Sequence, residues 1–130
     1  MSQENMEAAR EVFEQWRRGD FSGIDSLPDD FEVVTAREMP DAATYHGKDA
    51  REWLWAWVGS FDSLRMEPVE LTDVDDRVLA EFVQRGVPRG GSSPVEVRTW
   101  SLTTRRDGHI RRVELFLSRD QALEAAGLSE

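Results

Sequence analysis

The dipeptide Asp107-Gly108 constrains the fold of this chain more than any other feature of its sequence. It separates two strand-like segments, VEVRTWSLTT and HIRRVELFLS, and the helix-like segment RDQALEAAGL follows. A type I′ turn needs positive φ at both central residues, and Asp-Gly is among the pairs that favour it. The pattern therefore predicts a long hairpin closed by a terminal helix, as part of a broad, curved antiparallel sheet with an element packed across its face.

The rest of the chain alternates between helical and extended patterns. Apolar residues recur at helical spacing in 6–18, and Gly19 ends that pattern. The predicted elements are helices over 6–18, 20–27, 48–61 and a C-terminal segment, strands over 31–37, 65–74, 77–87 and 95–104 and the last hairpin strand, and a polar loop over 38–47. Helices followed by a run of strands indicate an α+β fold. We expect one domain spanning 1–130, with its core over about 6–128.

Composition excludes several classes of function. The net charge is -10 and Lys48 is the one lysine, which argues against a nucleic-acid partner. The chain has no cysteine, so we expect no disulfide or thiolate metal site, and the two histidines are too far apart to suggest another metal site. Nothing resembles a signal peptide, a membrane span or a phosphate-binding loop. These features predict a cytoplasmic protein without a cofactor.

Three segments carry a family resemblance. QWRRGDFSGIDSL, YHGKDAREWL and RDGHIRRVELFLSRDQALEAAGL resemble the nuclear transport factor 2-like superfamily, and within it the SnoaL-like polyketide cyclase branch. The resemblance implies a cone-shaped α+β barrel whose curved sheet wraps around the N-terminal helices. It also implies an apolar cavity at the wide end of the cone and a homodimer formed through the convex face of the sheet. The superfamily hosts many activities on this scaffold, so the resemblance alone assigns none.

A two-residue turn at Asp107-Gly108 sets a register for the hairpin. It places Trp100 opposite Leu115 and Leu102 opposite Val113. The expected inward-facing residues are Trp100, Leu102, Val113, Leu115 and Leu117, joined by Ala80, Phe82 and Gln84 of the preceding strand. The expected outward-facing residues are Thr99, Ser101, Thr103, Arg112 and Glu114.

The resemblance also points to positions where relatives carry catalytic groups. In the ketosteroid isomerase branch, the base, the tyrosine and the oxyanion acid correspond to Thr35, Val12 and Trp100 of this sequence. In the limonene epoxide hydrolase branch, the water-activating Arg, Asp and Asp correspond to Phe82, Gln84 and Leu115. None of these residues can act as the general base of those enzymes near neutral pH. The sequence therefore predicts a catalytic type of scaffold without its usual acids.

These observations favour a protein of unassigned activity that binds a small hydrophobic ligand. The predicted ligand-binding residues are Trp16, Thr35, Tyr45, Trp53, Trp57, Phe82, Gln84, Arg98, Trp100 and Leu115. One alternative is a cyclase, isomerase or hydrolase that uses Glu38 or His46 of the polar loop. Another is a non-catalytic dimeric interaction module, in which Trp57, Phe82 and Trp100 meet and fill the cone.

Overall fold

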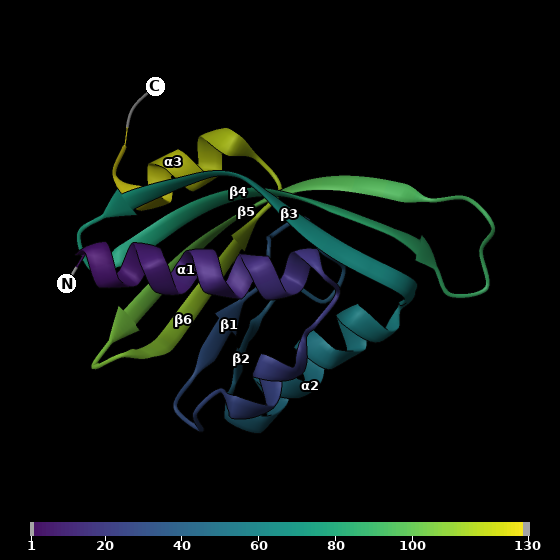
Figure 1. Ribbon diagram of the computed structural model, residues 1–130, viewed down its shortest axis with the longest axis horizontal. Coiled ribbons are helices and arrows are strands. Elements are labelled where there is room, and N and C mark those ends of the chain that lie inside the picture. Colours follow the sequence, from purple (N-terminus) through teal and green to yellow (C-terminus); the bar gives the residue numbers. More distant parts are fainter. Residues whose placement is uncertain (1, 129–130) are drawn as a thin grey trace.

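The computed structural model describes residues 2–128, which form three α-helices, one 3-10 helix and a six-stranded sheet (Figure 1). The elements are α1 (Ser2–Arg17), η1 (Ser22–Ser26), β1 (Glu32–Val34), β2 (Thr44–His46), α2 (Gly47–Gly59), β3 (Phe61–Val74), β4 (Arg77–Pro88), β5 (Val95–Arg106), β6 (His109–Phe116) and α3 (Arg119–Ala126). None of the helices in this part of the chain is long and apolar enough to cross a membrane.

The sheet is curved and unclosed, with strand order β2-β1-β6-β5-β4-β3. Its neighbouring strands are antiparallel except β1 and β6, which run parallel, with Val33 beside Val113. Helix α1 lies across one face, which we call the concave face, and α3 packs on the opposite, convex face. The predicted α+β fold is therefore confirmed, with one parallel strand pair that the sequence did not indicate.

The Asp107-Gly108 turn has the predicted conformation, with φ of 54° at Asp107 and 78° at Gly108. Next to the turn, Arg105 pairs with Ile110 as expected. A β-bulge follows, because Thr104 pairs with Arg112 and leaves Arg111 without an opposite residue. A bulge inserts one extra residue into one strand and shifts all later pairing by one position.

The predicted register is therefore wrong beyond the bulge. Trp100 lies opposite Phe116 instead of Leu115, and Leu102 lies opposite Glu114 instead of Val113. A slip of one residue moves a side chain to the other face of a sheet. As a result Trp100 and Leu102 belong to the convex face, where Leu102 is fully buried in a cluster with residues of α3.

The concave face is consequently more polar than predicted. Thr99, Ser101 and Thr103 of β5 face it, together with Val113 and Leu115 of β6. The predicted outward orientation of these three hydroxyl residues is wrong for the same reason. The inward orientation of Ala80, Phe82 and Gln84 is confirmed, since all three are buried on the side of α1. Leu117 follows β6 and is exposed.

Two local predictions need correction. The polar loop over 38–47 contains the short strand β2, which pairs with β1. The helix predicted over 20–27 is a 3-10 helix limited to Ser22–Ser26, and Asp20 Oδ1 accepts a hydrogen bond of 3.0 Å from the backbone N–H of Ser22. This bond satisfies a backbone donor at the start of the short helix.

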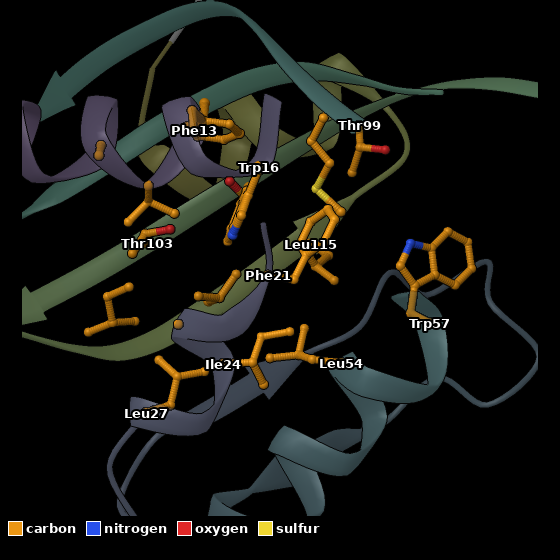
Figure 2. Close-up of a pocket in the computed structure, with 18 of the residues that line it drawn as sticks. Phe13, Trp16, Phe21, Ile24, Leu27, Leu54, Trp57, Thr99, Thr103 and Leu115 are labelled. Carbon is orange, nitrogen blue, oxygen red and sulfur yellow. The ribbon is translucent and has the colours of Figure 1, made fainter. Parts of the chain in front are cut away.

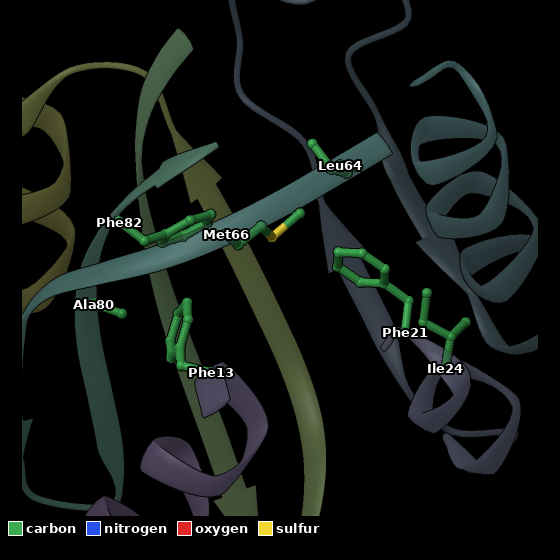
Figure 3. Packing of buried hydrophobic residues seen from close by; sticks show 7 residues of the cluster. All are labelled: Phe13, Phe21, Ile24, Leu64, Met66, Ala80 and Phe82. Carbon is green, nitrogen blue, oxygen red and sulfur yellow. The ribbon is translucent and has the colours of Figure 1, made fainter. Parts of the chain in front are cut away.

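The main hydrophobic cluster fixes α1 and η1 on the sheet (Figure 3). Phe13 of α1 meets Phe82 of β4 with ring centroids 5.2 Å apart, and Phe21 and Ile24 extend the contact toward β3. Tilted aromatic pairs of this kind stabilise a core beyond the area that they bury. The cluster occupies only part of the space between the helices and the concave face, and the rest forms a cavity.

Candidate functional site

A cavity of about 160 Å³ lies between the helices and the concave face of the sheet (Figure 2). Helix α1 and the segment that follows it contribute aromatic rings, α2 contributes a second wall, and β4, β5 and β6 form the floor. The large apolar side chains that line it include Phe13, Trp16, Phe21, Leu54, Trp57 and Leu115. The cavity is therefore enclosed mainly by hydrocarbon.

One end of the cavity carries a buried polar network. The indole Nε1 of Trp57 donates a 2.7 Å hydrogen bond to Gln84 Oε1, and Gln84 Nε2 donates a 3.0 Å bond to Thr99 Oγ1. Gln84 is 7% exposed and Thr99 is 1% exposed. An indole N–H can only donate, so this bond fixes which end of the amide faces Trp57. The network holds the indole of Trp57 against β4 at this end of the cavity.

The polar groups continue along β5 as a row. Thr99, Ser101, Thr103 and Arg105 alternate along the strand and all line the cavity. Arg105 is the one charged residue among the lining residues, none of which is Asp, Glu or His. Burial lowers the pKa of the Arg105 guanidinium from its ordinary value, and the group remains a cation at neutral pH.

The structure brings together five of the ten predicted ligand-binding residues. Those that line the cavity are Trp16, Trp53, Trp57, Gln84 and Leu115. Phe82 packs beside the cavity against Phe13. Trp53 also stacks on Tyr45, whose hydroxyl donates a 2.8 Å hydrogen bond to the Asp41 carbonyl.

The other predicted positions lie elsewhere. Thr35 is buried, and its hydroxyl bonds to the backbone of Ala43, so it ties β1 to the loop before β2. Arg98 was predicted to face inward but forms an ion pair with Glu81 on the convex face, and Trp100 is on that face too. Both differences result from the bulge in the β5–β6 hairpin, which reverses the orientation expected for these positions.

The two loop residues predicted as catalytic candidates are apart from the cavity. Glu38 is exposed, and its Oε2 accepts a 3.0 Å hydrogen bond from Gln121 of α3. His46 Nδ1 lies 3.4 Å from Glu32 Oε2, and its side chain is 69% exposed. Neither residue lines the cavity, and the two contact different partners. Within residues 2–128 there is also no group of three or more His, Cys, Asp or Glu side chains placed to hold a metal ion.

The alternative of a filled cone predicted that Trp57, Phe82 and Trp100 meet. Trp57 points into the cavity, whereas Trp100 packs on the opposite face of the sheet with α3. The three side chains therefore do not form one cluster.

A family model for the SnoaL-like domain matches residues 9–113, which cover most of the chain. The chain belongs to the SnoaL-like family. A search of curated proteins found no match.

Solved structures share the fold of this SnoaL-like domain at low sequence identity. A nuclear transport factor 2-like protein of unknown function from Burkholderia pseudomallei is 19% identical, with a TM-score of 0.72 over 93% of this chain and 95% of that chain. TerC, co-crystallised with polyporic acid, is 22% identical, with a TM-score of 0.71 over 95% and 98% of the two chains. A structure from Jannaschia sp. CCS1, named after the SnoaL-like polyketide cyclases, is 18% identical, with a TM-score of 0.69 over 96% and 92%.

The positions that were matched to catalytic groups of relatives now have defined surroundings in this SnoaL-like domain. Val12, Gln84 and Leu115 line the cavity, and Phe82 is beside it. Trp100 is on the convex face, so its match to an inward-facing acid is wrong, because it depended on the register without the bulge. The cavity is also lined by Ser101, Thr103 and Arg105, which the sequence did not indicate because the register without the bulge directs them outward.

Proposed function

We propose that this SnoaL-like domain binds a small, largely apolar molecule about the size of one substituted aromatic ring. The observation that carries the proposal is the cavity of about 160 Å³ with its hydrocarbon walls. An apolar cavity of about 150 Å³ is large enough to bind benzene in an engineered protein. Transfer of an apolar ring from water into such a space is favourable by about 25 cal/mol per Å² of buried apolar surface.

The arrangement of aromatic side chains supports a flat ligand. Trp53 and Trp57 stack along α2 with ring centroids 6.4 Å apart and an angle of 6° between their planes. On the other side, Trp16 meets Phe13 edge to face at 5.1 Å. Aromatic rings pack well in both of these geometries. The co-crystallisation of TerC with polyporic acid is consistent with this proposal, since TerC shares the fold.

The lining residues support binding over acid–base catalysis. General acid–base chemistry needs a group whose pKa lies near the working pH, within hydrogen-bond reach of the ligand. None of the residues that line the cavity is Asp, Glu or His, and the amide of Gln84 can orient a ligand without taking its proton. The family membership is compatible with either role, because this scaffold hosts both enzymes and binding proteins.

A calorimetric titration with the neutral probe 4-ethylbenzamide tests the proposal. Ser101 faces the cavity from β5, so Ser101→Phe would place a ring in the binding space. Ser63 is exposed on β3, which makes Ser63→Phe a matched control. We expect saturable binding by the native protein and by Ser63→Phe, and a loss of about tenfold or more in Ser101→Phe. Equal affinity in all three proteins, or no binding by the native protein to any single-ring probe, neutral or charged, would overturn the proposal.

We also propose that the chain forms a homodimer through the convex face and acts in the cytoplasm. The dimer is suggested by the resemblance to nuclear transport factor 2-like proteins, and the cytoplasm by the absence of cysteine from the sequence. On the convex face, Arg98 pairs with Glu81 and Arg85 pairs with Glu96. Light scattering on the purified protein tests the dimer, and a mass equal to one chain would contradict it.

A further inference from the structure

We propose that Arg105 binds an anionic group of the ligand, and therefore that the cavity selects small aromatic carboxylates over neutral molecules of the same shape. This inference rests on the proposed function and specifies the chemical class of its ligand. It is argued from the positive charge of Arg105 at one end of the cavity, because apolar walls alone do not select between a charged and a neutral ligand.

The first observation is that Arg105 is a cation without a counter-ion. It is half-buried, it is the one charged residue lining the cavity, and within residues 2–128 its guanidinium has no hydrogen bond or ion pair. The other half-buried arginines of this region all have partners: Arg51 with Asp29, Arg77 with the carbonyls at the end of α3, Arg111 with Asp30, and Arg112 with Glu32. The chain has a net charge of -10, so acids outnumber bases, and yet this half-buried arginine at the cavity is unpaired within residues 2–128.

The second observation is that Asp76, whose backbone contacts Arg105, has its carboxylate paired with a different residue. The backbone N–H of Arg105 donates a 3.3 Å hydrogen bond to the carbonyl of Asp76. The carboxylate of Asp76 lies 3.9 Å from Nε of Arg106, the exposed neighbour of Arg105. A partly desolvated cation is costly unless an anion compensates it, and burial alone accounts for the lowered pKa of Arg105. A ligand carboxylate would supply the missing charge.

The third observation is the position of Arg105 along the cavity. The row on β5 begins with Thr99 in the buried network beside Gln84 and ends with Thr103 and Arg105. Figure 2 shows Thr99 and Thr103 toward opposite ends of the cavity, with Trp16 and Leu115 between them. Thr103 makes no side-chain hydrogen bond within the described part of the chain, so its hydroxyl is available as a second donor.

These positions define how the ligand would lie. Its ring would occupy the space between Trp16 and Leu115, and its carboxylate would accept hydrogen bonds from the guanidinium of Arg105 and the hydroxyl of Thr103. A planar guanidinium matches the two oxygens of a carboxylate. The competing explanation is that Arg105 packs its aliphatic stem on the cavity wall and extends its charged group into water, as long cationic side chains often do.

Two probes of the same shape distinguish these explanations. Isothermal titration with 4-ethylbenzoate and 4-ethylbenzamide compares an anion with its neutral isostere. Hydrogen bonds to charged groups predict that the native protein binds the carboxylate roughly tenfold to hundredfold more tightly. We expect Arg105→Gln to abolish this preference and Arg105→Lys to give an intermediate preference.

Arg106→Gln is the matched control, because it removes the same charge from the adjacent position while Arg106 is exposed and paired with Asp76. It should retain the preference for the carboxylate. Equal binding of both probes by the native protein would overturn the inference and leave the proposed function intact, whereas binding of neither would overturn both. An equal loss of preference in Arg105→Gln and Arg106→Gln would mean long-range charge instead of contact, and would also overturn the inference.

A second measurement on the native protein covers the case in which Arg105→Gln does not fold. The side-chain Nε–Hε signal of Arg105 in a ¹⁵N-correlated NMR spectrum should shift on addition of 4-ethylbenzoate and not on addition of 4-ethylbenzamide. An unchanged signal at a saturating concentration of the carboxylate would contradict a direct contact.

Discussion

Replacing Leu102 and Leu115 by alanine tests which face of the sheet each side chain occupies. Leu102 is fully buried beneath α3 and contacts the cluster that contains Leu79 and Ala122. The substitution removes three carbons at about 0.8 kcal/mol each. The packed site under a helix cannot collapse completely, so a cavity term adds to this loss, and we expect Leu102→Ala to cost about 3–4 kcal/mol of unfolding free energy.

Leu115 differs because it is partly exposed and faces a cavity that already exists. Fewer contacts are lost, so we expect Leu115→Ala to cost only about 1–2 kcal/mol. The order of the two effects should be reversed for ligand affinity, with the larger change in Leu115→Ala. Leu115→Ala widens the cavity and should weaken binding of 4-ethylbenzamide about threefold to tenfold, whereas Leu102→Ala should change it by less than about twofold.

Equilibrium urea unfolding of the two variants gives the first comparison, provided that the slope m stays constant, and calorimetric titration gives the second. The register without a bulge would place both leucines on the concave face. In that case both variants would weaken ligand binding, and Leu102→Ala would have no special cost in stability. Such a result would refute the assignment of faces on which the cavity depends.

Three further predictions concern stability and are measured by urea unfolding. Gly86→Ala should lower the free energy of unfolding by about 1–3 kcal/mol, because the new Cβ would lie 2.7 Å from the carbonyl oxygen of Ser63. Gly59→Ala places its Cβ with no atom within 4 Å, so it should be neutral or raise the free energy of unfolding by up to about 1 kcal/mol. Equal effects of the two substitutions would contradict this contrast. Gln84→Leu should cost about 1–3 kcal/mol, because it leaves the Thr99 hydroxyl and the Trp57 indole without their partner, and an unchanged midpoint would count against the network. Hydrogen bonds from Ser22 lower the pKa of Asp20 in the folded state, so its contribution to stability is present above its ordinary pKa and is lost as the pH falls through the folded value. Asp20→Asn should therefore reduce the dependence of the free energy of unfolding on pH in the acidic range. The same pH dependence in the native protein and the variant would refute the assignment.

The turn and the helices were predictable because their signals are local. Asp107-Gly108 favours one turn type, and the apolar spacing in 6–18 fits a helix that the structure places at Ser2–Arg17. Strand β2 was missed because it has only three residues and is stabilised by pairing with β1. A strand this short carries too little periodicity to be distinguished from a loop.

The site was only partly predictable, and one residue explains most of the difference. Arg111, the extra residue in the bulge, has no sequence signal that distinguishes it from its neighbours. If the hairpin had no bulge, alternation along β5 would direct Arg98 and Trp100 inward. With Arg111 as the extra residue, Thr99 and Arg105 face inward instead. The inward orientation of the residues of β4 and α2 was predicted correctly, because it does not depend on the hairpin register. The orientation of Arg105, which is the most important position for the proposed ligand class, was therefore not predictable because of one extra residue in the bulge.

A crystal structure of the protein with bound 4-ethylbenzoate is the most direct test of the central claim. We expect the ring to lie between α1 and the concave face, near Trp16 and Leu115, with the carboxylate within hydrogen-bond distance of Arg105. A ligand bound anywhere outside this cavity, or a cavity closed by its own side chains at saturating ligand, would contradict it.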